Sequence, residues 1–350
     1  MKKRFQTMMM VVLIISLLAA CTATATQPPA VETEDVSEGS VEKLKVVLVL
    51  PQKLGDAGPM DDMNVNLQKA ATDFDIDYAV FEATEASQYE EVLRTYARED
   101  VDLIVTSMPA MVEATRTVAS EFPNVKFTIL FPLNTFDLPN VNVVDFAIWE
   151  AYYLAGILAG SLTDTYTVGH GIGAEQSALL ANYHAFTAGA QSINPDIEVM
   201  RVNANTFDDP AKGKDIGISM AGQGADIVVT DLASTGLGVI EAAEEVGFFV
   251  IGDSSPHHDL SPSVILGDTL CKYGPALYSA IANLVNGTWV SGIHHSNLAE
   301  GGVGLSISPR IAEFLTDEQK ERFETASKII EEKIDLIVNG SLTVEYNPNP

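Results

Sequence analysis

Residues 58–67, G-P-M-D-D-M-N-V-N-L, place four oxygen-bearing side chains within six positions. Asp62, Asn64 and Asn66 take the first, third and fifth positions of a calcium-binding loop, in which carboxylate and amide oxygens hold the ion. Such a loop needs glycine at its sixth position for a sharp turn, and Leu67 stands there instead. The pattern therefore argues against calcium, and it leaves a polar surface that a different ligand could contact.

The same stretch is typical of the start of a helix. Gly58 and Pro59 favour a turn, and Asp61 or Asp62 could cap a helix that runs to about residue 74. We therefore expect the polar side chains to lie at a helix start that follows a strand, a common place for the wall of a binding site.

Two pairs of histidines raise the possibility of a zinc or other transition-metal site. His257 and His258 are adjacent in one segment, and His294 and His295 are adjacent in another. Neighbouring side chains on an extended chain point in opposite directions, so adjacent histidines seldom bind one ion together. Metal binding is therefore the weaker alternative, and no cofactor is expected.

Motifs that would indicate an enzyme are incomplete. Residues 169–174, G-H-G-I-G-A, fit the glycine pattern of a dinucleotide-binding turn, but Asn203 and Asn205 stand where the next strand should supply an acidic residue. Residues 217–221, G-I-S-M-A, lie in a helical pattern, where a nucleophilic serine could not be presented on a sharp turn. We do not expect an enzyme.

The first 20 residues are typical of an export signal, with M-K-K-R followed by an apolar run at 8–18 that is too short to span a bilayer. The L-A-A-C box resembles the bacterial lipoprotein signal, which implies that Cys21 becomes a lipidated first residue. Residues 21–43 are rich in Thr, Pro, Ser and Glu and should form a flexible tether. We therefore expect an extracytoplasmic protein whose contact with the membrane is its lipid anchor.

The charge of the chain restricts its partners. Residues 1–20 hold three of the 20 basic residues and no acidic one, so residues 21–350 carry 17 basic and 48 acidic residues, a net charge of −31. This acidity argues against a nucleic-acid polymer or an anionic membrane surface as partner. Apart from Cys21 the only cysteine is Cys271, which excludes an internal disulfide framework.

Apolar runs alternate with helical patterns after residue 44, and this rhythm predicts α/β lobes with parallel sheets covered by helices. The predicted strands are 45–50, 78–81, 101–106 and 125–130, then 166–169, 197–202, 225–230, 248–252 and 263–267. The predicted helices of the second set are 177–192, 210–223 and 237–246, with Asp209 as N-cap of the middle one. Ligands bind beyond the carboxyl ends of such strands, so Ser107 and Asp231 are candidate site residues.

Several blocks resemble one known family. They include F-A-I-W-E-A-Y-Y-L-A-G (146–156), A-F-T-A-G-A-Q-S-I-N-P-D-I-E-V (185–199), F-D-D-P-A-K-G-K (207–214) and G-L-G-V-I-E-A-A-E-E-V-G-F-F-V-I-G (236–252). In order and spacing they resemble the basic membrane protein family of lipoproteins, which includes the purine nucleoside receptor lipoproteins. The similarity runs from about residue 45 to about residue 340.

The resemblance implies a type I periplasmic-binding-protein fold with two Rossmann-like lobes joined by a hinge that the chain crosses three times. The lobes would be 44–147 plus 270–290 and 148–269 plus 291–345. It implies a monomeric solute-binding component of an ABC importer, with a permease and an ATPase as partners. A purine nucleoside or similar small polar ligand would be captured by hinge closure. A sugar-derived signal as ligand, or a sensory lipoprotein that feeds a membrane receptor, remains an alternative.

The resemblance also implies site residues. The family's first motif, approximately D-D-x-S-F-N-Q, aligns with residues 61–67, so Asp61, Asp62 and Asn66 would read polar edges of a base. Val65 replaces the usual phenylalanine, which removes a stacking partner.

Aromatic and charged candidates complete this set. Phe207 matches a family aromatic that lines the cleft, and Trp149 lies beside the hinge crossing, whereas Asn182 stands where relatives often carry a phenylalanine. Asp253 and Lys272 resemble the family's aspartate and lysine that hold the ribose, with Ser254 as the alternative to Asp253.

Overall fold

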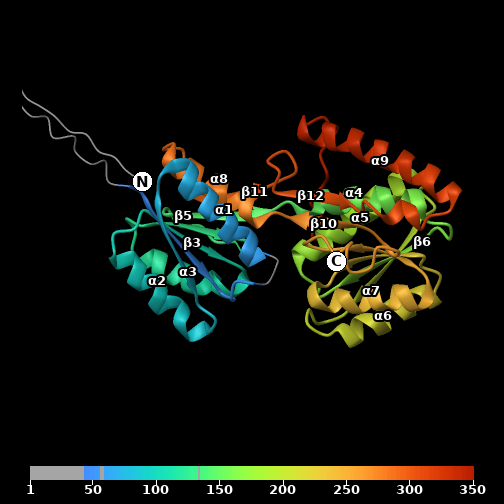
Figure 1. Ribbon diagram of the computed structural model, residues 1–350, viewed down its shortest axis with the longest axis horizontal. Helices are drawn as coiled ribbons and strands as arrows, with labels where there is room; N and C mark the ends of the chain where they lie inside the picture. Colours follow the sequence, from blue (N-terminus) through green and yellow to red (C-terminus); the bar gives the residue numbers. More distant parts are fainter. Residues whose placement is uncertain (1–42, 56–58, 133–134) are drawn as a thin grey trace, which may run out of the picture. The chain divides into compact units, whose positions relative to one another are not determined.

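Two six-stranded sheets form the framework of the part of the chain that the structure describes, residues 43–55, 59–132 and 135–350 (Figure 1). The structure is a computed structural model. The predicted signal peptide at 1–20, Cys21 and the tether as far as residue 42 lie outside the described residues. No helix in the described ranges is both long enough and apolar enough to cross a membrane.

The first sheet has the strand order β11-β5-β4-β3-β1-β2, and its neighbouring strands are parallel. Its strands are β1 (Lys45–Leu50), β2 (Asp77–Glu82), β3 (Leu103–Ser107), β4 (Lys126–Leu130), β5 (Val141–Phe146) and β11 (Gly292–Ser296). One face is covered by α1 (Pro59–Phe74) and α8 (Tyr273–Val285), the other by α2 (Tyr89–Arg98) and α3 (Val112–Glu121) (Figure 1). Each face has its own apolar core, as both faces of a buried parallel sheet require.

The second sheet has the order β12-β10-β9-β8-β6-β7, in which only the β10–β12 pair is antiparallel. Its strands are β6 (Thr167–Ile172), β7 (Glu198–Asn203), β8 (Ile227–Asp231), β9 (Phe249–Gly252), β10 (Ile265–Cys271) and β12 (Val303–Ile307). Its helices are α4 (Ile148–Leu162), α5 (Ser177–Ile193) and α9 (Asp317–Val338) on one face, and α6 (Pro210–Gly222) and α7 (Gly236–Val246) on the other. Figure 1 shows α6 and α7 side by side.

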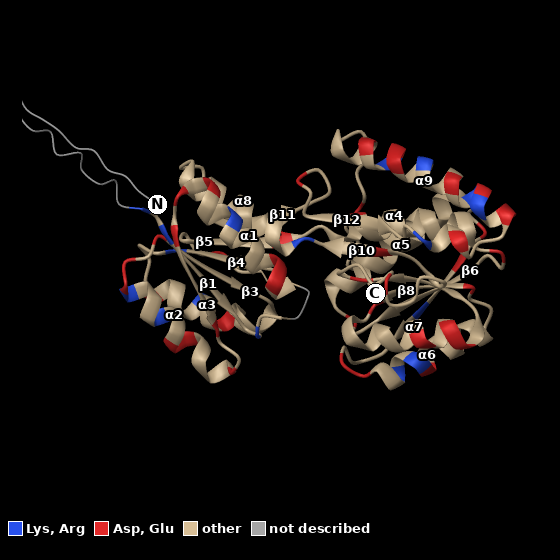
Figure 2. Ribbon diagram, in the orientation of Figure 1, with Lys and Arg blue, Asp and Glu red and all other residues tan. Residues whose placement is uncertain are grey.

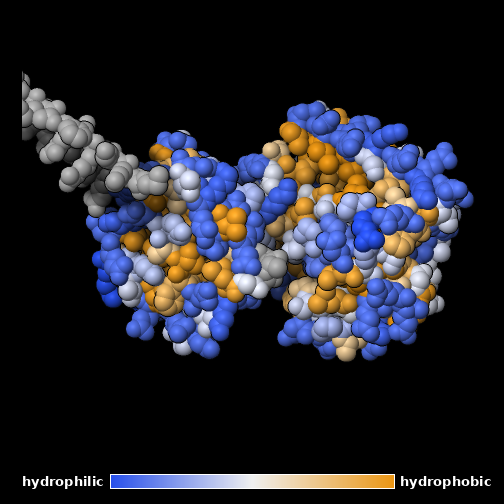
Figure 3. Space-filling model, viewed as in Figure 1, coloured by the Kyte–Doolittle hydropathy of each residue, from blue (hydrophilic) through white to orange (hydrophobic). Residues whose placement is uncertain are grey.

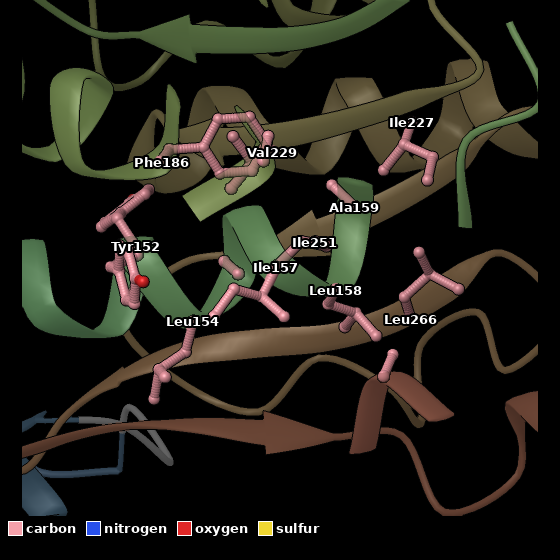
Figure 4. Packing of buried hydrophobic residues seen from close by; sticks show 14 of the residues in the cluster. Tyr152, Leu154, Ile157, Leu158, Ala159, Phe186, Ile227, Val229, Ile251 and Leu266 are labelled. Atoms are coloured by element: carbon pink, nitrogen blue, oxygen red, sulfur yellow. The ribbon is translucent and has the colours of Figure 1, made fainter. Parts of the chain in front are cut away.

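Helix α4 is the centre of the second core, and apolar residues surround it almost completely (Figure 4). It packs closely on α5 because glycines stand at the crossing. A Cβ on Gly189 would lie 2.0 Å from the carbonyl oxygen of Tyr153, and one on Gly156 would lie 2.1 Å from that of Phe186. Only glycine permits this approach, which fixes α4 against α5.

The surface carries the charges. Figure 2 shows acidic and basic residues along α9 and on α6 and α7, and Figure 3 shows hydrophilic residues around several hydrophobic patches. Lys214 of α6, for example, lies 2.6 Å from Glu241 and 2.8 Å from Glu245 of α7. The charged residues thus lie on the outer helices, and the two sheets are mainly apolar.

The nine predicted strands and three predicted helices are confirmed, with ends that differ by a few residues. Asp209 is the N-cap of α6, where its side chain accepts a hydrogen bond from the backbone N–H of Lys212. Strands β5, β11 and β12 were not expected. All three pair at or next to a sheet edge, where a strand needs no continuous apolar run.

Three connections carry the chain from one sheet to the other, after β5, after β10 and after β11. The assignment of residues 291–296 to the second lobe is wrong. Strand β11 pairs in parallel with β5, from Gly292 opposite Asn142 to Ser296 opposite Phe146, so this segment belongs to the first sheet. The sequence S-G-I-H-H-S hides this role because its pairing partner lies about 150 residues away.

Candidate binding site

Backbone strain collects at the carboxyl ends of the strands. Of eight non-glycine residues with positive φ in the described ranges, five lie one or two positions beyond a strand: Met108 (70°), Phe131 (54°), Asn205 (53°), Ala233 (48°) and Ser254 (69°). A left-handed conformation costs a non-glycine residue about 1–2 kcal/mol. Strain of this kind clusters at functional sites, where the surroundings hold the backbone in place.

Two adjacent cavities lie at these strand ends. The first, which we call the aromatic cavity, has a volume of ≈50 Å³ and is lined by aromatic and polar side chains. These include Phe131, Asp145, Trp149, Asn182, Asp231 and Tyr346. The second, the lysine cavity, has a volume of ≈290 Å³ and is lined by Pro59, Asp62, Ser255, Pro256, Lys272 and Tyr273 among others. Ser254, Leu270 and Cys271 line both, so the two spaces share a wall.

The aromatic cavity has two groups of rings. Trp149, in the first turn of α4, lies with its ring centroid 4.7 Å from that of Tyr346, and its Nε1 donates to the carbonyl of Val344 at 3.2 Å. Phe131, which follows β4, lies 6.2 Å from Phe146 of β5, centroid to centroid. In both pairs the ring planes are tilted, by 58° and 55°, so the rings pack on each other and line the cavity with aromatic surface.

Asp231 at the end of β8 is the polar centre of the aromatic cavity. One carboxylate oxygen accepts a hydrogen bond from Nδ2 of Asn182 at 2.8 Å. Burial, followed by the nearby charge of Asp253, raises the pKa of Asp231 to about 8. At neutral pH its carboxyl group therefore carries a proton and can both donate and accept a hydrogen bond.

Lys272 brings a positive charge to the lysine cavity. Its side chain is partly buried at the end of β10, and its backbone N–H donates to the carbonyl of Gly302 at 2.8 Å. Within the described ranges its ammonium group makes no ion pair and no hydrogen bond, although acidic residues outnumber basic ones 48 to 20 in the chain. A partly buried ammonium without a partner is costly unless a ligand satisfies it.

The polar residues at the start of α1 are not equivalent. Asp62 lines the lysine cavity, and its carboxylate also accepts from the backbone N–H of Gly274 at 2.7 Å and from Nδ2 of Asn66 at 3.0 Å. Asp61 accepts from the backbone N–H of Gly55 at 2.8 Å. The expectation that Asp61 or Asp62 caps the helix is wrong, because α1 already begins at Pro59 and both lie in its first turn.

Five predicted site residues line neither cavity: Asp61 and Asn66 of α1, and also Ser107, Phe207 and Asp253. Ser107 at the end of β3 is fully buried, and its hydroxyl has no partner among the described residues. The ring of Phe207 packs against Gly173, where a Cβ would lie 2.1 Å from Cε1. Asp253 accepts from Oγ1 of Thr230 at 2.5 Å and from the backbone N–H of Ala233 at 3.1 Å, so its carboxylate braces the loop after β8. Ser254, the alternative to Asp253, does line both cavities.

The four histidines separate into two pairs with different partners. His257 and His258 both contact the carboxylate of Asp268, whereas His294 lies 2.8 Å from Glu300 and His295 lies 3.7 Å from Asp145. In the described part of the chain, no group of three or more His, Cys, Asp or Glu side chains could hold a metal ion. The geometry gives the metal alternative no support.

Several lining residues were missed by the sequence reasoning. Phe131 follows a predicted strand, so the strand-end argument that selected Ser107 would also have selected it. Asp145 lies on β5, which has no long apolar run, and Tyr346 lies in a tail without regular structure. No local pattern in the sequence identifies these last two.

Sequence comparison identifies the family. Residues 43–339 match the family model of the PnrA-like ABC transporter substrate-binding proteins, called Bmp. Basic membrane protein B of Borrelia garinii subsp. bavariensis is 28% identical over 89% of this chain and 90% of its own length. A purine-binding protein of Brucella abortus is 27% identical over 71% of each chain. The ABC transporter nucleoside-binding protein BmpA of Lactococcus lactis is 28% identical over 67% of this chain and 72% of its own length.

Solved structures show the same fold. An ABC transporter solute-binding protein from Aeropyrum pernix is 24% identical, with a TM-score of 0.68 over 86% of this chain and 92% of its own. A second one, from Conexibacter woesei, also has a TM-score of 0.68 at 21% identity over 87% of this chain and 99% of its own. The fold is therefore that of the type I periplasmic binding proteins.

The family has a defined role. Its members are extracytoplasmic, membrane-associated proteins that bind a small-molecule substrate for an ABC permease and ATPase, and they are not enzymes. The match covers well over half of the chain, and the resemblance seen in the sequence is confirmed. The chain belongs to the PnrA-like family of ABC transporter substrate-binding proteins.

Proposed function

We propose that this protein is the lipid-anchored binding component of an ABC importer and that it captures a purine nucleoside or a similar small polar ring compound. The observation that carries the proposal is the pairing of the two cavities across Ser254 and Cys271. One offers aromatic faces beside a hydrogen-bonding carboxyl group, and the other offers an ammonium group without a partner. A nucleoside has a planar base that suits the aromatic cavity and a sugar that suits the lysine cavity.

The aromatic cavity suits a planar base. Trp149 and Tyr346 provide ring faces, and Asn182 and Asp231 provide an amide and a carboxyl group that are already hydrogen-bonded to each other at 2.8 Å. Polar groups fixed in this way discriminate well between ligands, because an analogue without the matching group leaves them unpaired. The hydrogen-bonded pair of Asn182 and Asp231 therefore favours a heterocyclic ligand that has hydrogen-bond donors and acceptors of its own.

The lysine cavity suits the sugar. The Lys272 ammonium and the Asp62 carboxylate line the same space, together with Ser254 and Ser255. Groups of opposite charge and hydroxyls can bind the donor and acceptor sides of ribose hydroxyls. Neither cavity alone reaches the roughly 300–1,000 Å³ usual for ligand sites, so one ligand would fill both and would be enclosed further by hinge closure.

The proposal accommodates the departure at Val65. This residue is exposed on α1, with 62% of its surface accessible, and it gives no ring at the position where the family motif has phenylalanine. Trp149, Phe131 and Tyr346 supply aromatic surface on the opposite side of the shared wall. The names of the relatives from Brucella abortus and Lactococcus lactis, purine-binding and nucleoside-binding, agree with this ligand class.

The anchor and the oligomeric state belong to the same proposal. Cys21 would carry the lipid, residues 22–42 would link it to β1, and the binding unit would act as a monomer. The test is membrane fractionation of cells that express the full chain. The unaltered chain should pellet with membranes, and Cys21→Ser should release it. A Cys21→Ser chain that stays with the membrane would contradict lipid anchoring at this residue.

The ligand is tested by a thermal-shift screen of the chain against inosine, adenosine, guanosine, ribose, glucose and zinc chloride. A ligand at a hundredfold excess over its dissociation constant should add about 2.7 kcal/mol to the free energy of unfolding. We expect a shift with at least one nucleoside and none with ribose alone. A shift with zinc that a chelator reverses, with no nucleoside effect, would refute the proposal.

Tryptophan fluorescence gives a matched control. The chain has two tryptophans. Trp149 lines the aromatic cavity, whereas Trp289 lines neither cavity and its Nε1 donates to Oγ1 of Thr128 on β4 at 3.3 Å. Nucleoside binding should quench the fluorescence of Trp149. Trp289→Phe should keep the quenching and Trp149→Phe should abolish it. The opposite pattern would place the ligand outside the aromatic cavity.

A further inference from the structure

The loop between β9 and β10, residues 253–264, builds the wall that the two cavities share. Ser254 lines both cavities, and Ser255 and Pro256 line the lysine cavity. The loop reaches this position through a strained backbone, because Ser254 has a φ of 69°. Strain at a non-glycine residue persists only where the surroundings hold it, so some contact must fix this loop.

Asp268 of β10 is the group that contacts the loop from behind. Its side chain is fully buried, and its two oxygens are shared between two histidines of the loop. Oδ1 lies 3.0 Å from Nδ1 of His257, and Oδ2 lies 3.2 Å from Nδ1 of His258. An ionised carboxylate only accepts, so both imidazoles must carry a hydrogen on Nδ1. The loop is therefore tied to the sheet by two charge-assisted hydrogen bonds.

The neighbouring strand is shaped to admit this carboxylate. Gly252 of β9 pairs with Asp268 in the parallel register, and a Cβ on Gly252 would lie 2.1 Å from Oδ1 of Asp268 and 3.1 Å from Nδ1 of His257. Any larger residue would displace the carboxylate or the ring. The glycine thus leaves room for the contact between Asp268 and His257.

The loop turns so that both histidines face one group. Adjacent side chains point apart on an extended chain, but a turn begins here, and the backbone N–H of Leu260 donates to the carbonyl of His257 at 2.8 Å. Ahead of the turn, the N–H of Ser255 donates to the carbonyl of Asp253 at 2.8 Å. The carbonyl of Ser254 accepts from the N–H of Cys271 at 3.3 Å, which joins the loop to the cavity wall.

We propose that Asp268, His257 and His258 form a positioning clamp that fixes residues 254–256 in the conformation that lines the binding cavities. None of the three lines either cavity, so they act on the ligand through Ser254 and its neighbours. The proposal rests on the proposed function for the identity of the ligand, but the clamp itself can be measured without any ligand.

The test uses the full chain without ligand, followed by peptide-resolved hydrogen exchange and by alkylation of Cys271 detected by mass spectrometry. Cys271 is buried and its N–H is bonded to Ser254, so a displaced loop should expose its thiol. His257→Leu removes the hydrogen bond from Nδ1 to the carboxylate of Asp268. We expect roughly tenfold or greater increases in exchange at Ser255 and Leu260 and in alkylation of Cys271.

Two variants control this test. His257→Asn keeps an N–H donor near the position of Nδ1 and should restore the exchange and alkylation rates of the unaltered chain. His294→Leu removes a histidine of another segment that also contacts a carboxylate, Glu300, and should leave both rates unchanged. Because Asp268→Asn removes the charge in the core and could prevent folding, the pair His257→Leu and His257→Asn decides the question.

Inosine binding, measured by calorimetry, separates the clamp from the ligand assignment. If the unaltered chain binds inosine, His257→Leu should weaken binding about tenfold or more and His257→Asn should restore it. If the unaltered chain binds no nucleoside while the exchange rates respond as expected, the clamp stands and the ligand assignment fails. If His257→Leu leaves both exchange and alkylation at the rates of the unaltered chain, the clamp is refuted.

Discussion

Asp62 of α1 accepts a hydrogen bond at 2.7 Å from the backbone N–H of Gly274, in the first turn of α8, 212 positions later in the chain. Asn66 supports the carboxylate from the next turn of α1, with Nδ2 3.0 Å from Oδ1 of Asp62. A Cβ on Gly274 would lie 2.1 Å from Nδ2 of Asn66, so glycine is needed at this crossing. The aspartate therefore joins two helices as well as lining the lysine cavity.

Asp62→Ala should destabilise the protein. It leaves the N–H of Gly274 without its acceptor, whereas Nδ2 of Asn66 keeps its hydrogen bond to the backbone carbonyl of Asp62 at 2.9 Å. An unsatisfied buried donor costs about 1–3 kcal/mol. Urea denaturation should show a loss of this size in the free energy of unfolding. Asn64→Ala, on the same helix but with only a 3.4 Å contact to Gln68, is the control and should change stability by less than about 0.5 kcal/mol. Equal effects of the two variants would contradict the role of Asp62.

The protein should become less stable as the pH rises, because the buried carboxyl group of Asp231 loses its proton. Its pKa is raised from 3.8 to about 8 in the folded protein, so between these values the folded state binds more protons than the unfolded state. The free energy of unfolding contributed by this group therefore falls from about pH 4 to about pH 8 and is constant above. Asp231→Asn does not ionise and should be more stable than the unaltered chain at pH 8 by about 2 kcal/mol or more, with little difference at pH 4.

Urea denaturation of both proteins from pH 4 to pH 9 measures this difference. Asn can still accept from Asn182, so the packing of the site is retained. If the two stability curves are parallel across this range, the raised pKa of Asp231 is wrong. A residue that costs stability and yet lines the aromatic cavity is expected to contribute to binding, so Asp231→Asn should also weaken nucleoside affinity.

His170 should make the protein sensitive to acid. Its ring is fully buried on β6, stacked 5.2 Å from the ring of Tyr152, and within the described ranges neither ring nitrogen has a hydrogen-bond partner. Burial, with a smaller contribution from Arg201, lowers the pKa of His170 to about 3. The unfolded chain takes up this proton below about pH 6.5, so stability is lost as the pH falls from about 6.5 towards 3.

His170→Leu removes this titration at similar volume. At pH 4.5 the variant should exceed the unaltered chain by about 2–3 kcal/mol in the free energy of unfolding. His184→Leu replaces a partly exposed histidine on α5. This variant should lose as much stability at low pH as the unaltered chain does. If His170→Leu still loses stability at low pH to the same extent as the unaltered chain, another group is responsible for the acid sensitivity.

Lys272→Met should separate binding from folding. The ammonium group lines the lysine cavity and makes no ion pair within the described ranges, so without ligand the variant should have a free energy of unfolding equal to or higher than that of the unaltered chain. Calorimetric titration with inosine should show at least a tenfold loss of affinity, about 1.4 kcal/mol. Lys69→Met, which removes a lysine paired with Asp73 on α1, should retain the affinity. Equal affinity in Lys272→Met would remove Lys272 from the site.

Local patterns in the sequence predicted the interior strands well. The runs that became β1, β3, β4, β8 and β9 are buried on both faces, so each is rich in apolar residues. The edge strand β11 has no such run, because His294 and His295 are half exposed, and its place beside β5 depends on pairing with a distant part of the chain. The lobe boundary at this strand was wrong for that reason.

Some residues of the candidate site could also be predicted from the sequence, whereas the positions of others depend on the tertiary structure. Trp149 was selected from the sequence because it lies beside the hinge crossing, Asp231 because it follows a strand, and Lys272 because it resembles a family lysine. All three line the two cavities. Ser107 satisfied the same strand-end rule, but its hydroxyl is buried away from both. The position of a residue at the end of a strand predicts that it lies at the carboxyl edge of the sheet. Whether its side chain faces the cavity depends on the loop that follows the strand.

By itself the sequence determined the alternation of strands and helices, the two lobes, the family and the acidic surface, because each of these depends on residue type and local spacing. Only the tertiary structure decided which strand ends meet at the cavities, that Asp62 bonds to α8, and that His257 and His258 contact one carboxylate. These contacts join residues that the chain brings together from 10 to 212 positions apart, and no local pattern encodes such distances.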